Sequence, residues 1–293
     1  MSKGRMMTAG VILVLLLALA AYWFLRPSPL KTWVTLPDGR TYAIDLPADP
    51  KDARLILVLH GGGGGPTQIA RNTGFSAPAL AQGYAVAYPS GSGRFGGLTF
   101  NAGYCCGYAQ RMKIDDLGYL NAVADDARAR FGLAAAPIYI TGMSNGAMMA
   151  ETFAARYPRQ VRAAAAVSGT LDLSQFTPAG PVPLLVIHGT ADENIRYDGG
   201  FGKNSWSKTN FTSVDAVLQA FSAPYGAALH SIDTISGPIQ RRDWRLAGQT
   251  VLSRILITGG VHLWPGGTRS ARKGDISGLS ATTEILRFFA EHP

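Results

Sequence analysis

The sequence predicts an α/β fold with a mainly parallel central sheet, on the strength of three observations. Short, continuous apolar runs recur along the chain, the first of them "LILVL" at 55–59; such runs are typical of strands buried on both faces. Segments with helical patterns separate the runs, which favours right-handed crossovers between parallel strands. No internal repeat or low-complexity segment divides the 293 residues. We therefore expect a single domain over residues 27–293.

The expected elements begin with a hairpin, in which residues 33–36 and 41–46 alternate around the turn sequence Pro37-Asp38-Gly39. Buried strands and helices then alternate. The strands are expected at 55–59, 84–88, 138–141, 163–167, 184–187 and 255–257, and helices at 115–130 and 147–157. Two long segments, 90–113 and 197–212, are rich in glycine and aromatic residues and fit no core element. Loops of that length in a compact domain are usually functional, so we expect these two near a site.

The first 26 residues form a separate unit. Lys3 and Arg5 precede an uncharged apolar run, Ala9 to Leu25, which Arg26 closes. This is the pattern of an export signal. Ala18-Leu19-Ala20 offers a cleavage site, but aromatic residues continue the run beyond it, as in an uncleaved anchor. Both alternatives predict an exported protein, periplasmic or extracellular, and residues 9–25 would associate with the inner membrane if they are retained.

The formal charge of +8 does not point to nucleic acid, because its basic residues are scattered and no nucleic-acid-binding motif accompanies them. The two cysteines, Cys105 and Cys106, are neighbours. They form either a strained vicinal ring or two separate thiols. No other cysteine or histidine lies at ligand spacing from them, so we expect no metal site and no cofactor. We expect a monomer.

The stretch "YITGMSNGAMMA" places Ser144 between Gly142 and Gly146, directly after an expected strand and before an expected helix. That context defines a nucleophile elbow, a sharp turn that presents the serine hydroxyl above the edge of the sheet. Side chains at the two flanking positions would collide across the turn, so glycine suits both. Ser144 is the candidate nucleophile.

A serine nucleophile needs a base, and the base needs an acid that orients it. In this arrangement the chain order is serine, acid, histidine. His262 follows the last expected strand, and Asp192 follows the strand at 184–187. Both therefore lie at the edge of the sheet where Ser144 is expected. Rival acids are Asp172, Asp198 and Glu193.

The transition state of acyl transfer also needs two donors for an oxyanion. One is expected to be the N–H of Asn145, the residue after the nucleophile. The other is expected from the glycine run "HGGGGG" after the first buried strand, with Gly62 preferred over Gly61 and Gly63. The run is not a phosphate-binding loop, because no G-K-[ST] follows it.

Six motifs together resemble the polyhydroxybutyrate depolymerase-like esterases, a group that includes feruloyl and acetyl xylan esterases. They are "HGGGGG", "NAGYCCGY", "DDLGYL", "TGMSNGAMMA", "HGTAD" and "GGVHLWPGG", and the likeness covers roughly residues 30–293. The resemblance implies an α/β-hydrolase fold, a secreted serine esterase, and the roles of nucleophile for Ser144, acid for Asp192 and base for His262.

The expected reaction is hydrolysis of a small or oligomeric ester of the polyhydroxybutyrate, feruloyl or acetyl type through an acyl-enzyme. The motif match suggests that Trp264 lies near the acyl site, and packing in the core is its alternative role. The aromatic loop residues Tyr104 and Trp206 are candidates for substrate contact, and packing against the core is their alternative role. An acyltransferase with the same three residues, and a non-catalytic binding protein of the cell envelope, remain the alternative functions.

Overall fold

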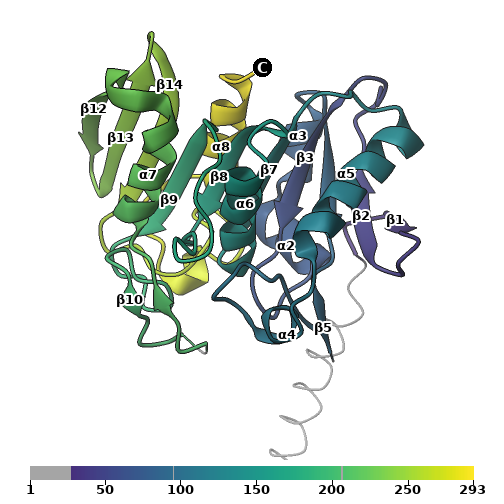
Figure 1. The fold of residues 1–293 in the computed structure, drawn as a ribbon, viewed down its shortest axis with the longest axis horizontal. Helices are drawn as coiled ribbons and strands as arrows, with labels where there is room; N and C mark the ends of the chain where they lie inside the picture. Colours follow the sequence, from purple (N-terminus) through teal and green to yellow (C-terminus); the bar gives the residue numbers. More distant parts are fainter. Residues whose placement is uncertain (1–27, 95, 206) are drawn as a thin grey trace, which may run out of the picture.

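The computed structural model describes residues 28–94, 96–205 and 207–293. Within them a ten-stranded sheet runs in the order β1-β2-β4-β3-β7-β8-β9-β14-β13-β12 (Figure 1). Its strands are β1 (Thr32–Thr35), β2 (Thr41–Asp45), β3 (Arg54–Leu59), β4 (Tyr84–Pro89), β7 (Ile138–Met143), β8 (Val161–Val167), β9 (Leu184–Gly189), β12 (His230–Ser236), β13 (Ile239–Leu246) and β14 (Gln249–Ile257).

The centre of the sheet is parallel, from β4 through β3, β7, β8 and β9 to β14. Antiparallel pairs extend it at both edges, β1 and β2 on one side and β13 and β12 on the other. The predicted α/β-hydrolase fold is confirmed. The predicted hairpin is also present, and Gly39 closes its turn at a positive φ of 85°. Because the central strands are parallel, their carboxyl ends all meet at one edge.

Helices cover both faces of the sheet (Figure 1). One apolar cluster joins alternate strand residues such as Leu55 and Leu57 to the helices of the first face, and a second joins Ile56 and Val58 to those of the other. The first face carries α5 (Asp116–Phe131), α6 (Asn145–Arg156) and α7 (Val214–Ser222); the second carries α2 (Pro66–Thr73), α3 (Ser76–Leu80) and α8 (Ala281–Ala290). The alternation explains why the strand sequences are continuously apolar.

The two long segments predicted to be loops hold only short elements. The first contains the small hairpin of β5 (Ser92–Arg94) and β6 (Gly97–Thr99) and the short helix α4 (Gly107–Arg111). The second contains β10 (Gly200–Phe201) and β11 (Asn210–Phe211). Short 3-10 turns, η1 (Ala223–Ala228) and η2 (Ala271–Lys273), complete the fold. Cys105 and Cys106 are joined as a vicinal disulfide, the first of the two alternatives that the sequence left open.

The expected export segment, residues 1–26, lies outside the described residues. In the part of the chain that the structure describes, no helix combines the length and the apolar character needed to cross a bilayer.

Candidate active site

Ser144 occupies a sharp turn between β7 and α6, at the carboxyl edge of the sheet. Its backbone has φ 57° and ψ −123°, a strained conformation for a residue with a side chain. The flanking glycines are required sterically: a Cβ on Gly142 would lie 2.5 Å from the carbonyl carbon of Gly146, and a Cβ on Gly146 would lie 2.5 Å from the carbonyl oxygen of His60. The predicted collision across the turn is confirmed for Gly142, whereas Gly146 is required because the backbone at the end of β3 lies against it.

The structure brings Ser144, His262 and Asp192 together from three separate loops. The Nε2 atom of His262 lies 3.0 Å from the Oγ atom of Ser144, and its Nδ1 atom lies 2.7 Å from Oδ2 of Asp192. His262 comes from the loop after β14, and Asp192 from the loop after β9. Lys273 donates from its amino group to the backbone carbonyl of His262 at 3.1 Å, which ties the histidine loop to η2.

Asp192 is buried and held by its own backbone surroundings. Its Oδ1 atom accepts hydrogen bonds from the N–H groups of Asn194 and Ile195, both at 2.9 Å, which leaves Oδ2 for His262. Burial raises the pKa of this carboxyl, but the hydrogen bond and charge of His262, the nearby His188 and the Ile195 N–H outweigh burial, and the net pKa is lowered. A carboxylate is therefore the stable form facing His262.

The rival acids lie elsewhere. Asp172 is buried, but its oxygens accept hydrogen bonds from Ser174 and Gln175. Asp198 is exposed, and Glu193 is paired with Asn204 and Lys203. None of the three contacts His262 in the structure.

The glycine run lies against the nucleophile. A Cβ on Gly61 would be 3.4 Å from the Cβ of Ser144. Gly63 N–H already donates to the carbonyl of Leu98 at 2.9 Å, and Gly64 N–H donates to that of Gly61 at 3.0 Å. Gly62 N–H makes no hydrogen bond to the described residues. This favours Gly62 over Gly63 as an oxyanion donor. The N–H of Asn145, the first residue of α6, has no acceptor within its own helix.

Two side chains that the sequence did not assign to the site hold these loops in place. The amide of Asn145, which is buried, donates to the Phe100 carbonyl at 2.9 Å and accepts from the Phe100 N–H at 2.7 Å. His60 contacts Gly61 O through Nδ1 and accepts from Gly91 N–H through Nε2, both at 2.9 Å. The Phe100 and His60 rings also pack together, with centroids 4.6 Å apart. The only sequence signal for this network was the position of His60 at a strand end.

Because the His60 ring is buried, we expect the free energy of unfolding to fall in mild acid. Burial lowers its pKa from 6.5 to about 4. Between these values the unfolded chain binds a proton that the native chain does not, so stability falls as the pH falls through this window. The loss reaches about 3 kcal/mol by pH 4. Urea unfolding at pH 7.5 and pH 4 measures it.

The variant His60→Gln keeps a donor and an acceptor but removes the titrating ring, so its stability is expected to depend less steeply on pH in this window. His230→Gln, at an exposed position, is the control for replacing a histidine. The explanation fails if His60→Gln and the parent lose equal stability between the two pH values.

Two of the three candidates for substrate contact lie within the described residues, and both pack against the fold. Trp264 is 1% exposed, packs edge-on against Phe75 and donates from Nε1 to Thr282 at 3.1 Å. The structure therefore favours the second of the two roles that the sequence left open for Trp264, packing in the core. Tyr104 is partly buried, and its hydroxyl lies 2.7 Å from that of Thr170, so it packs the first long loop onto the fold. Trp206 lies outside the described residues.

No group of three or more histidine, cysteine, aspartate or glutamate side chains in the described residues has an arrangement that could hold a metal ion. The chemistry that the site offers rests on the serine, the histidine, the aspartate and the backbone donors. A hydroxyl bonded to an imidazole that is itself oriented by a buried carboxylate is the arrangement of an activated nucleophile.

Comparisons with known proteins agree on the class. The chain is 30% identical over 270 residues to an esterase of Nocardia uniformis subsp. tsuyamanensis, NocK, covering 78% of this chain and 72% of that one. It is 27% identical over 172 residues to a feruloyl esterase B of Neurospora crassa, over 57% of this chain and 53% of that one. No family model matches the chain.

Among solved structures, an acetyl xylan esterase from Aspergillus awamori superposes with a TM-score of 0.60 at 15% identity, covering 89% of this chain and all of that one. At this identity the likeness concerns the fold alone. The chain belongs to the esterases of the α/β-hydrolase fold, and it is a carboxylic ester hydrolase of the serine hydrolase class. None of these three relatives is described as a polyhydroxybutyrate depolymerase, so that part of the resemblance has no support from them.

Proposed function

We propose that this chain hydrolyses carboxylic esters through a Ser144-His262-Asp192 triad and an acyl-enzyme. The single observation that carries the proposal is the unbroken series of hydrogen bonds from Ser144 Oγ through His262 to Asp192, at 3.0 and 2.7 Å. Neither bond requires a rearrangement before reaction, because both lie within ordinary hydrogen-bonding range.

In the first step His262 Nε2 accepts the proton of Ser144 as its Oγ attacks the ester carbonyl. The carbonyl oxygen becomes an oxyanion, which the N–H groups of Gly62 and Asn145 stabilise. His262 then gives the proton to the departing alcohol. Asp192 Oδ2 accepts from Nδ1–H throughout, which fixes the tautomer and stabilises the imidazolium.

In the second step water replaces the alcohol. His262 takes a proton from the water, which attacks the acyl-enzyme. The carbonyl–Oγ bond then breaks as His262 returns this proton to Ser144 Oγ, and the acid is released. The sum is ester plus water to acid plus alcohol, and the enzyme returns to its first state. The substrates proposed for this chain are esters with feruloyl or acetyl groups, as in the names of the relatives, and oligomers of hydroxybutyrate.

We also propose that residues 1–26 direct export, as a cleaved signal or as an anchor, and that residues 27–293 form the catalytic domain, acting as a monomer. The basic flank and apolar run of the N-terminus support this.

The test uses the residue 27–293 fragment if it folds on its own and the full chain in detergent otherwise, with 4-nitrophenyl acetate as substrate. We expect turnover by the parent, followed by activity on acetylated xylan oligomers or methyl ferulate. Folded parent protein that hydrolyses none of these esters would contradict the proposal. Transfer of the acetyl group to an added alcohol in preference to water would favour the acyltransferase instead.

A further inference from the structure

Two hollows open on either side of the glycine run and share Gly63. The first has a volume of about 420 Å³ and is lined by Gly62, the hairpin of β5 and β6, and α4. The second, of about 1130 Å³, is lined by Gly63 to Gln68 and by residues 268–272 in part. Gly62, the expected oxyanion donor, lines the first hollow, so a group bound there would lie next to that donor.

The charge of the first hollow is of one sign. Arg94 and Arg111 line it, and no aspartate or glutamate does. Arg111 forms no ion pair or hydrogen bond with another described side chain, and Arg94 lies over the ring of Tyr108 at 5.8 Å. Among the described residues, the lining of the first hollow therefore carries positive charge and no acidic side chain.

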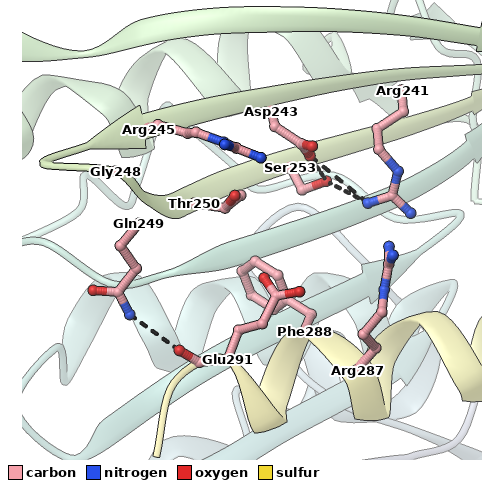
Figure 2. A pocket seen from close by; sticks show the side chains of 10 residues that line it. All are labelled: Arg241, Asp243, Arg245, Gly248, Gln249, Thr250, Ser253, Arg287, Phe288 and Glu291. Carbon is pink, nitrogen blue, oxygen red and sulfur yellow. Dashed lines mark hydrogen bonds and ion pairs between the residues drawn. The ribbon is translucent and has the colours of Figure 1, made fainter.

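A third hollow differs, because arginines and acidic residues line it together (Figure 2). It lies between β13, the amino end of β14 and α8, at the far end of β14 from His262. There Asp243 and Glu291 share the lining with the arginines, and Arg241 is paired with Asp243 and Glu284. Acidic residues thus accompany the arginines there, whereas none of the described acidic residues lines the first hollow with Arg94 and Arg111.

We propose that the active site selects esters that carry a free carboxylate, and that Arg94 and Arg111 bind this carboxylate. The inference rests on the proposed esterase function. The guanidinium group stays charged at all relevant pH values, and its planar donors fit the two oxygens of a carboxylate. The hollow joins the glycine run at Gly62, so a carboxylate there would also position the ester against the oxyanion donors.

The experiment compares pairs of esters that differ in charge. Mono-4-nitrophenyl adipate and its methyl ester place the carboxylate on the acyl side; 4-acetoxybenzoate and 4-acetoxybenzamide place it on the alcohol side. We expect the parent to favour the charged member of at least one pair by about tenfold in kcat/KM. The pair that shows the preference identifies the side of the ester that enters the hollow.

The variant with Arg94→Gln and Arg111→Gln is expected to reduce this preference to about one. Arg159→Gln removes an exposed arginine at the other end of α6 and is expected to keep the parental preference. Equal kcat/KM for charged and neutral esters in the parent overturns the inference, as does a preference that survives in the double variant. Failure of the esterase proposal itself is distinct, because then none of the four esters is hydrolysed.

Discussion

Replacing Ser144 with alanine is expected to lower kcat by roughly 10⁶-fold while the protein stays folded. Among the described residues the only side-chain partner of Oγ is His262, so the substitution removes one hydrogen bond and leaves no buried polar group there that depended on it. Alanine meets the same backbone strain at φ 57° as serine does. Single-turnover and steady-state rates with 4-nitrophenyl acetate measure the loss, and thermal unfolding confirms that the fold remains.

The variant His262→Ala tests whether the same residues act as one unit. Alone it is expected to cost nearly as much as Ser144→Ala, and the double variant is expected to be no slower than either, since each change disables the same step. His230→Ala, at an exposed position on β12, is the matched control. Losses that multiply in the double variant would show that His262 acts independently of Ser144 and would contradict the triad.

Much of this site could be predicted from the sequence because each of its residues follows a strand. Continuous apolar runs reveal buried parallel strands, and parallel strands bring their carboxyl ends to one edge. The positions of Ser144, Asp192 and His262 after the expected strands therefore implied that they meet, and the structure brings them within hydrogen-bonding distance. The steric need for glycine at 142 could likewise be predicted from the turn itself, whereas the close approach of β3 to Gly146 could not.

Other features depend on contacts between segments far apart in the chain, which no local pattern encodes. The buried amide of Asn145 bonds the backbone of Phe100, 45 residues away. Trp264 lies in the same sequence motif as His262, yet its ring packs against Phe75 in the core. The strands β12 and β13 have exposed or half-exposed faces and lack the continuous apolar run of a buried strand. The sequence analysis therefore predicted neither of them.

The variant Asp192→Asn is expected to lower kcat by roughly 10⁴-fold through the tautomer of His262. Two backbone N–H groups, of Asn194 and Ile195, donate to Oδ1 of Asp192. They would hold the carbonyl oxygen of an asparagine in that place, so its NH₂ group would face His262. The imidazole Nδ1 would then have to accept a hydrogen bond, and Nε2 would carry the proton. A protonated Nε2 cannot take the proton of Ser144.

The defect of Asp192→Asn is expected in proton transfer and not in substrate binding. KM with 4-nitrophenyl acetate should change little under conditions where acylation is slower than substrate release, and the loss should fall on kcat. Asp198→Asn, at an exposed position in the same loop between β9 and β10, serves as the control for removing one negative charge nearby. A 10⁴-fold loss in both variants would point to a general electrostatic effect. A loss confined to Asp192→Asn is expected if the hydrogen bond from His262 Nδ1 to Asp192 determines which nitrogen of the His262 ring carries the proton.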